Sequence, residues 1–362
     1  MRRTASTIYA IFCTLLLVAG LGVGFYFAWQ RGVYVVAWYV AGFAVGFVLS
    51  PTLHELGHIV FAKANGMRLV YAKFFCCKLV LQNGKLRKQF ASPFAPDETQ
   101  VVPKFGGNMQ KRAVAYTLGG VVFSGLFFLA LTITALLLTV FFQPVFLLWG
   151  CLPYATYLFL LNVAPCTYAS GKTDTLIYIG IKKGEPAEKN MLSAMEIQGE
   201  LYAGKSFAEI DERLYFDNPV LCEDEPLFAV TCDLQYRYFL EKQDFQSAGE
   251  RLNRLAQIQP YLSALEVEKL AGELVYMHAL GGDVESAQES GKYCQNYLSG
   301  DEVSAKRILA TFAYATGKKE ETEILLRQAE RALDKEIMLG VAKFEKILLS
   351  RIEKAKSEEN NE

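Results

Sequence analysis

The chain has 362 residues, 52% of them hydrophobic, and a formal net charge of only −1. That small total conceals a division, because residues 1–170 carry 13 Lys and Arg against three Asp and Glu, whereas residues 171–362 have a net charge of −11. A basic, apolar first part followed by an acidic second part excludes a uniformly soluble protein, favours a membrane domain joined to a soluble one, and gives no reason to expect a nucleic-acid partner.

The first apolar run covers about residues 7–29 and follows Met-Arg-Arg. A cleaved signal peptide is the competing interpretation. The run is longer than the roughly 7–15 apolar residues of a signal peptide, and no small-residue cleavage site precedes the next span. We predict a retained transmembrane helix, with Arg2 and Arg3 keeping the N-terminus in the cytosol.

The second predicted span, about residues 33–62, contains His54-Glu-Leu-Gly-His58. Residues four apart lie on one face of a helix, so both imidazoles can reach one metal ion. Glu55 flanks that ion and is better placed to act on a water molecule than to ligate. This is the HExxH arrangement of a zinc hydrolase.

The alternative is a pair of ordinary core histidines. The carboxylate of Glu55 argues against it, because an ionisable side chain at membrane depth costs roughly 2.5–3.5 kcal/mol on insertion scales and is usually functional.

The loop of about residues 66–111 is basic, which is typical of a cytosolic segment. Within it, residues 68–90 predict a β-hairpin whose turn is Gln82-Asn83-Gly84-Lys85, since Asn-Gly favours a tight turn. Two interpretations remain open. The segment is either a plain membrane-surface loop or a strand edge near the active site that pairs with an extended substrate.

The third predicted span, about residues 113–142, contains Gly119-Gly120 and Ser124-Gly125, and small residues at this spacing let helices approach closely in lipid. Gln143-Pro144 makes a short outer turn before the fourth span, about residues 145–163. Four spans with short outer turns place both termini in the cytosol.

A catalytic zinc takes three protein ligands, and HExxH supplies two. Asp174 follows the last span on the same side of the membrane and is the best candidate for the third, whereas Asp97 and Glu98 lie in the loop. Asp174 could instead be the N-cap of a helix that starts at Thr175.

These features together resemble the site-2 protease family of intramembrane zinc metalloproteases over about residues 33–185. The matching parts are HExxH within a span, then Asn-x-x-Pro and an aspartate after a later span. The family aspartate is normally followed by glycine, where this chain has Thr175. By this resemblance the metal ligands are His54, His58 and Asp174, the catalytic acid/base is Glu55, and the residue that places substrate or stabilises the oxyanion is Asn162.

The second part, residues 186–362, is predicted to be a cytosolic, all-helical domain. Three similar helix-pair junctions begin at Gln243, Gly282 and Gly317, spaced by 39 and 35 residues. This spacing loosely resembles tetratricopeptide repeats, and an irregular helical bundle is the alternative. Either arrangement favours binding of a protein partner or a substrate tail over catalysis. His278, alone in an apolar run, is interpreted as a core or groove histidine.

The sequence therefore predicts a mainly α protein: a membrane domain of four helices with a small hairpin, residues 1–185, followed by the helical domain. The expected function is zinc-dependent cleavage of a membrane-protein or membrane-peptide substrate near the cytosolic side of a bilayer, in the cell membrane of a bacterium. The alternative is a zinc-binding membrane adaptor or regulatory protein without proteolysis.

Overall fold

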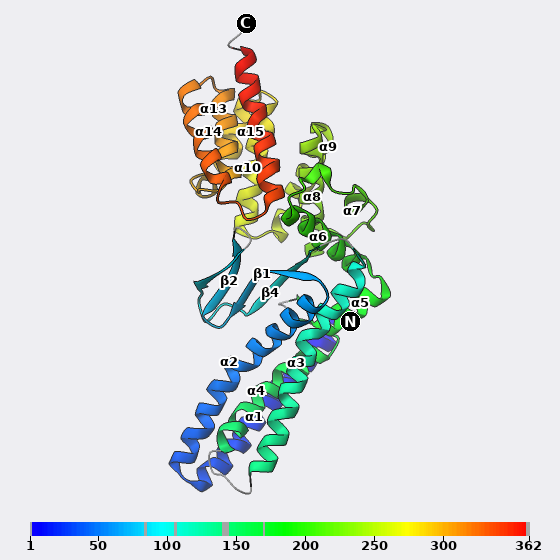
Figure 1. Cartoon of the computed structure of the whole chain (residues 1–362), viewed down its shortest axis with the longest axis vertical. Helices are drawn as coiled ribbons and strands as arrows, with labels where there is room; N and C mark the ends of the chain where they lie inside the picture. Colours follow the sequence, from blue (N-terminus) through cyan, green and yellow to red (C-terminus); the bar gives the residue numbers. More distant parts are fainter. Residues whose placement is uncertain (1, 83–84, 105–106, 140–144, 169–170, 360–362) are drawn as a thin grey trace. The chain divides into compact units, whose positions relative to one another are not determined.

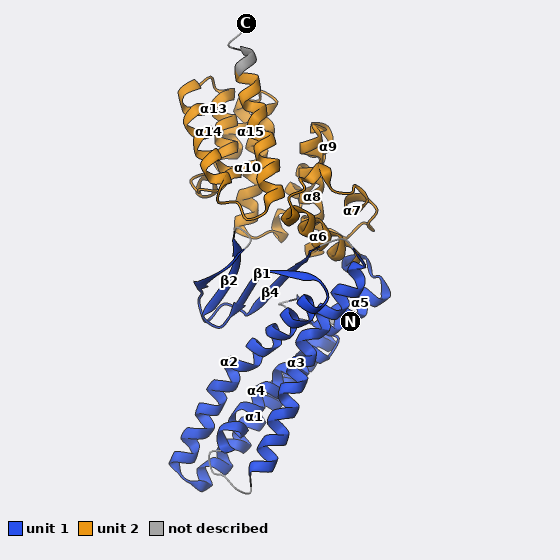
Figure 2. Ribbon diagram, in the orientation of Figure 1, with its two compact units in different colours: residues 1–188 blue, residues 189–362 orange. Residues whose placement is uncertain are grey.

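The computed structural model describes residues 2–82, 85–104, 107–139, 145–168 and 171–359, and it divides into two compact units, residues 1–188 and 189–362 (Figure 2). Both units are mainly helical, and the first also contains a small antiparallel sheet (Figure 1).

Four helices of the first unit are long and apolar enough to cross a membrane, consistent with a membrane protein. The third begins at Met109, four residues earlier than predicted, because the side chain of Asn108 caps it by accepting a hydrogen bond from Lys111 N. The predicted end of that span, residues 140–142, and the Gln143-Pro144 turn lie outside the described residues. The helices are α1 (Arg2–Arg31), α2 (Val33–Ala64), α3 (Met109–Leu138) and α4 (Phe146–Val163).

Helix α2 packs closely against α3 and α4 through glycines. A Cβ built on Gly57 would lie 2.2 Å from the Gly119 carbonyl oxygen of α3. A Cβ built on Gly42 would lie 2.0 Å from the Leu147 carbonyl oxygen of α4. Backbones therefore touch where side chains are missing, which is how helices associate in lipid. The small residues of α3 do pack against the helix that carries the two histidines, as the sequence predicts.

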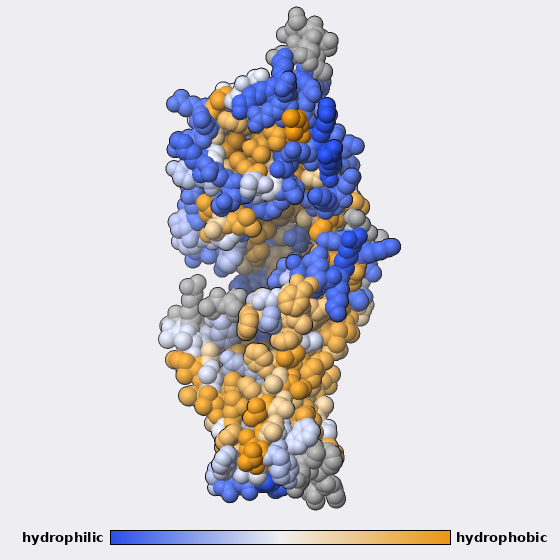
Figure 3. Space-filling model, turned by 90° about the vertical axis from the view of Figure 1, so that its left-hand side faces the viewer, coloured by the Kyte–Doolittle hydropathy of each residue, from blue (hydrophilic) through white to orange (hydrophobic). Residues whose placement is uncertain are grey.

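Apolar side chains cover the outside of these helices. Leu15, Trp29 and Leu137 each expose 60% or more of their surface. Figure 3 shows that the face over the membrane-spanning helices is largely hydrophobic. A surface of this kind is expected next to lipid and not next to water.

The predicted hairpin is part of a larger sheet. Four antiparallel strands lie in the order β3-β2-β1-β4, and the Gln82-Asn83-Gly84 turn falls partly outside the described residues, at positions 83–84. The sequence predicts a hairpin over residues 68–90, where the structure has three strands, the first two of which separate at Phe75 with a φ of 48°. The strand β4 was not predicted. The strands are β1 (Met67–Phe74), β2 (Cys77–Gln82), β3 (Lys85–Phe90) and β4 (Glu98–Pro103).

A short segment after α4 carries the chain into helix α5 (Asp174–Lys183) through the two-residue strands β5 (Thr167–Tyr168) and β6 (Gly171–Lys172). Helix α5 ends at Gly184, whose φ of 67° is the left-handed conformation of a typical helix C-terminus. This helix begins one residue earlier than predicted, at Asp174.

In the second unit each predicted junction lies between two helices. The first residue of each junction is left-handed: φ is 64° at Gln243, 77° at Gly282 and 72° at Gly317. The repeated turn shows three helix pairs, while membership of the tetratricopeptide class stays a prediction. The remaining longer helices are α6 (Pro186–Ala203), α8 (Pro226–Lys242), α9 (Phe245–Gln257), α10 (Ala264–Leu280), α11 (Val284–Gly291), α13 (Val303–Ala315), α14 (Lys319–Leu333) and α15 (Leu339–Glu359). Short helices between them are η2 (Phe207–Glu209), α7 (Arg213–Phe216), η3 (Gln259–Tyr261) and α12 (Gln295–Leu298).

The core of this unit contains a buried ionic cluster. The guanidinium of Arg307 is fully buried and donates to Glu273 and to Glu345, each at 2.7 Å. Tyr236 adds a hydrogen bond to Glu273 at 2.8 Å. His278 is not part of the core: 38% of its side chain is exposed, because it lies in the last turn of α10 beside the helix junction.

Candidate metal centre

Three side chains from two distant segments of the sequence converge in the first unit. His54 Nε2 lies 3.1 Å from Asp174 Oδ2, and His58 Nε2 lies 3.3 Å from the same oxygen. The two imidazole Nε2 atoms are 3.3 Å apart. Both histidines are buried, with 7% and 5% of their surfaces exposed, and Asp174 is partly buried. The structure therefore brings together all three residues that the sequence predicts as metal ligands.

Helix α3 fixes the orientation of both imidazoles from behind. His58 Nδ1 is 2.8 Å from the carbonyl oxygen of Tyr116, and His54 Nδ1 is 2.9 Å from Ser124 Oγ. A carbonyl oxygen only accepts, so the Nδ1 of His58 carries a proton and donates it. In the neutral ring, the Nε2 of His58 then presents a lone pair to the centre, as in metal-binding histidines.

The third group is an anion. Burial by itself would raise the pKa of the Asp174 carboxyl, but the two imidazoles beside it hold that pKa well below its ordinary value. Its Oδ2 is buried and receives no hydrogen bond with good geometry from the described residues. Lone pairs of imidazole nitrogen and a carboxylate oxygen thus face one another. Only a cation, either a proton on an imidazole or a metal ion, satisfies all three atoms.

Gly120 keeps open the space in which these atoms meet. A Cβ built on Gly120 would lie 2.4 Å from His58 Nε2 and 2.6 Å from His54 Cε1. Any larger residue would therefore press against the ligand atoms themselves. Three donor atoms within 4.8 Å of one another beside a backbone that lacks a side chain fit a small metal ion.

The backbone after α4 holds Asp174 in place without using its carboxylate. Thr173 is the N-cap of α5: its hydroxyl oxygen lies 3.4 Å from Leu176 N and donates to the Ala164 carbonyl at 2.8 Å. Thr175 donates its hydroxyl to the Asn162 carbonyl at 2.9 Å. The interpretation of Asp174 as the helix cap is therefore wrong, and the side chain is free to face the histidines.

The other predicted residues have different surroundings. Glu55 is half-buried, and no hydrogen bond or ion pair joins its carboxylate to another side chain in the described ranges. The Asn162 amide donates to Leu158 O within its own helix, at 3.1 Å, and this hydrogen bond does not lie at the centre. Asp97 is occupied by Lys73 Nζ at 3.0 Å and Phe75 N at 2.7 Å, which agrees with its exclusion as a ligand.

Sequence reasoning missed the three contributions of α3 to this centre, namely the Tyr116 carbonyl, Gly120 and Ser124. The sequence did contain a signal for Gly120 and Ser124, because residues four apart lie on the same face of a helix. That pattern was interpreted only as helix packing. Searches with protein-family models, curated proteins and solved structures found nothing that matches this chain.

Proposed function

We propose that this chain is a zinc-dependent intramembrane endopeptidase of the site-2 protease type. The observation that carries the proposal is that His54 and His58, on a helix apolar enough to span a bilayer, meet Asp174 of α5 around the space left by Gly120. Buried ionisable residues in such a helix are usually functional.

Two imidazoles and one carboxylate form a typical set of protein ligands for catalytic zinc, which keeps one further position open. When bound, zinc would supply Lewis acidity and lower the pKa of a water molecule to about 7. The chain's own residues set up this chemistry: Ser124 and the Tyr116 carbonyl orient the imidazoles, and the threonines on either side of Asp174 orient the carboxylate.

Glu55 is the proposed acid/base. Glu55 directly follows His54 in the sequence, and its carboxylate is not committed to another described side chain. It would accept a proton from the attacking water and pass that proton to the leaving amine. Asn162 would contact the substrate or its oxyanion after a change of rotamer, since its amide now donates to its own helix.

The proposed substrate is a membrane-anchored protein or peptide, cleaved near the cytosolic side of a bacterial cell membrane, with both termini of the chain in the cytosol. A helical substrate must unwind before its carbonyl can be attacked, and an exposed strand edge can hold an extended segment. One residue supports a role for β4: Tyr116 donates its hydroxyl to Thr99 O of β4 at 2.8 Å, while its carbonyl holds His58.

Glu55→Gln tests the function directly. We expect the variant to keep bound zinc and its fold, while substrate cleavage falls by roughly 10²–10⁴, the usual cost of losing a general base. Membrane-peptide fragments would be identified by mass spectrometry in cells that express the wild-type or the variant chain, and zinc would be measured in the purified proteins. Glu320→Gln, an exposed residue of α14, is the matched control.

Turnover close to wild type in Glu55→Gln would overturn the protease proposal. Zinc bound by both proteins, with no fragment that depends on Glu55, would favour the non-proteolytic zinc-binding adaptor instead.

A further inference from the structure

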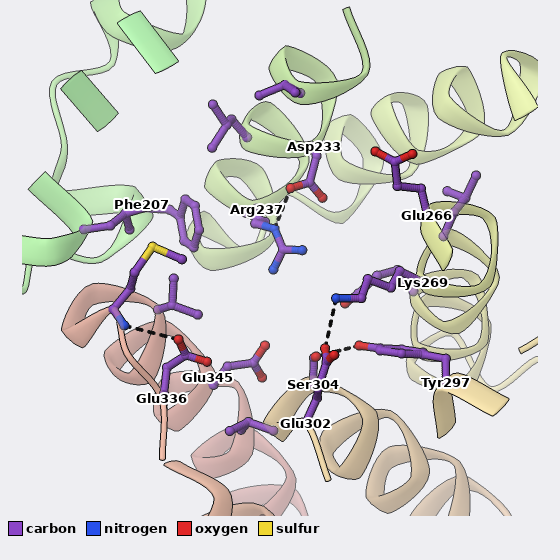
Figure 4. Close-up of a pocket in the computed structure, with 18 of the residues that line it drawn as sticks. Phe207, Asp233, Arg237, Glu266, Lys269, Tyr297, Glu302, Ser304, Glu336 and Glu345 are labelled. Carbon is purple, nitrogen blue, oxygen red and sulfur yellow. Dashed lines mark hydrogen bonds and ion pairs between the residues drawn. The ribbon is translucent and has the colours of Figure 1, made fainter. Parts of the chain in front are cut away.

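The helical unit contains a cavity that the proposed peptide cleavage does not use. Its volume is about 710 Å³, within the range of roughly 300–1,000 Å³ that is usual for ligand sites. Side chains from α6, α8, α10 and α15 line it, together with residues that precede α13 (Figure 4).

The wall of the cavity is both apolar and strongly acidic. Leu234, Leu270 and Val341 are among its apolar residues. Seven of its residues are Asp or Glu and only three are Lys or Arg. Figure 4 shows the Arg237 guanidinium directed into the opening, with Lys269 and Glu302 on another wall.

The cations in the wall do not balance its carboxylates. Arg237 is paired with Asp233 at 2.9 Å, and Lys269 is paired with Glu302 at 3.1 Å. No salt bridge joins Asp301 to another residue in the described part of the chain. The cavity therefore has an excess of negative charge even after its internal ion pairs are formed.

The floor of the cavity adds to this excess. Glu273 and Glu345 both line it, and both share the single guanidinium of Arg307. One guanidinium therefore serves two carboxylates, which leaves this part of the wall with more acids than cations. A positively charged ligand would compensate the remaining carboxylate charge.

A basic peptide fits these properties better than a small amine. Apolar residues between the carboxylates can take apolar side chains, and Gln198 and Ser304 offer polar groups to a peptide backbone. Membrane proteins carry excess Lys and Arg in the cytosolic flanks of their spans. The substrate class proposed above therefore supplies such a segment, although only this step of the argument rests on the proposed proteolysis.

We propose that this cavity binds a segment of the substrate in which Lys or Arg residues alternate with apolar ones, the cytosolic flank of its membrane span. The cavity thereby selects substrates by charge, and the bond is cleaved at the metal centre.

The test uses the full chain in detergent and two fluorescein-labelled ten-residue peptides, one alternating Lys and Leu and the other alternating Glu and Leu. Fluorescence anisotropy should show binding of the basic peptide at least tenfold tighter than that of the acidic one. The double variant Asp301→Asn with Glu302→Gln should bind the basic peptide at least threefold more weakly at low salt. The loss of affinity should be smaller at high salt, because exposed charges are screened.

A matched double variant, Glu320→Gln with Glu330→Gln, neutralises two exposed acids of α14 outside the cavity and should leave the affinity unchanged. Val230→Trp, at a cavity residue of α8 that is 39% exposed, should obstruct the opening and abolish binding. Thermal unfolding would establish that each variant is folded.

Equal affinity for the two peptides, or wild-type affinity in both cavity variants, would overturn the proposal. Spermidine that competes as well as the peptide would show a polyamine site and overturn the peptide assignment. Glu55→Gln should bind the basic peptide normally, so a failure of proteolysis and a failure of this cavity are distinguishable.

Discussion

Each unit of the molecule places three ionisable side chains close together, and the two clusters differ in charge balance. In the helical unit, Arg307 lies between Glu273 and Glu345 and supplies a permanent cation. In the membrane unit, His54, His58 and Asp174 turn lone pairs and a carboxylate toward one another.

The first cluster contains its own permanent cation, whereas in the second only a proton on an imidazole or a bound metal ion can supply one. Burial of ionised groups is costly unless they are paired. A buried ionic cluster that contains a permanent cation is part of the fold, while a cluster whose cation can only be a proton or a metal ion is a candidate binding site. This distinction yields predictions that differ between the two clusters.

Gly120→Ala should have the largest effect on the membrane cluster. The added methyl would occupy the space in which the ligand atoms meet, so we expect bound zinc to fall to background while the melting temperature changes little. Zinc would be measured in purified protein by mass spectrometry. Gly125→Ala is the control, because its Cβ would meet only the ring of Phe159, at 3.0 Å. Normal zinc content in Gly120→Ala would disprove the proposed position of the ion.

Arg307→Met should destabilise the helical unit by about 3–5 kcal/mol, since removal of one partner leaves two buried carboxylates uncompensated. Urea unfolding followed by tryptic digestion would measure the loss, and the zinc content should stay the same. Arg331→Met, an exposed substitution on α14, provides the comparison. If Arg307→Met were as stable as wild type, the cluster would not be a structural element of the core.

Asp174→Ala should reduce zinc affinity by about 100-fold or more, because one of three ligands and the only anion among them are lost. Competition with a zinc chelator would measure the zinc affinity. Asp97→Ala should bind zinc as wild type does, since Asp97 is held by Lys73 and Phe75. Equal affinities in the two variants would remove Asp174 from the ligand set.

Ser124→Ala should have the smallest effect and lower zinc affinity by about tenfold. Loss of a group that hydrogen-bonds to a metal ligand usually lowers metal affinity by about 10–100-fold, and this is the lower end of that range. The control is Thr132→Val on the same helix, whose hydroxyl donates to Phe128 O in its own helix at 2.8 Å. Conservative Ser124→Thr should restore most of the affinity. No change in Ser124→Ala would show that the His54 ring is held by packing alone.

Much of the centre could be predicted because its signals are local. The HExxH spacing puts both histidines on one helix face, and the order of Asn162, Pro165 and an aspartate after the fourth apolar helix carries the resemblance that points to Asp174. The three helix junctions were also visible, since each depends on a left-handed residue and the turn chemistry beside it.

The remaining features depend on contacts between residues far apart in sequence. Strand β4 is six residues long, ends in Pro103 and contains Glu98, so its composition is poor for a strand; pairing with β1 forms it. Ser124 lies 70 residues from His54, and no local pattern connects the two. Whether Asp174 caps a helix or faces the histidines was decided by Thr173, which takes the capping role.

The position of Asp174 in α5, beyond the last span, has a consequence for biogenesis. His58 and Asp174 are separated by 116 residues, so the ribosome makes the two histidines long before the aspartate. The carboxylate is fixed only after α4 has been inserted and the threonines on either side of Asp174 have bonded to its C-terminal carbonyls. A nascent chain, or one truncated before Asp174, therefore lacks the complete cluster, and the proposed proteolytic activity would appear only once residues 1–188 have been assembled.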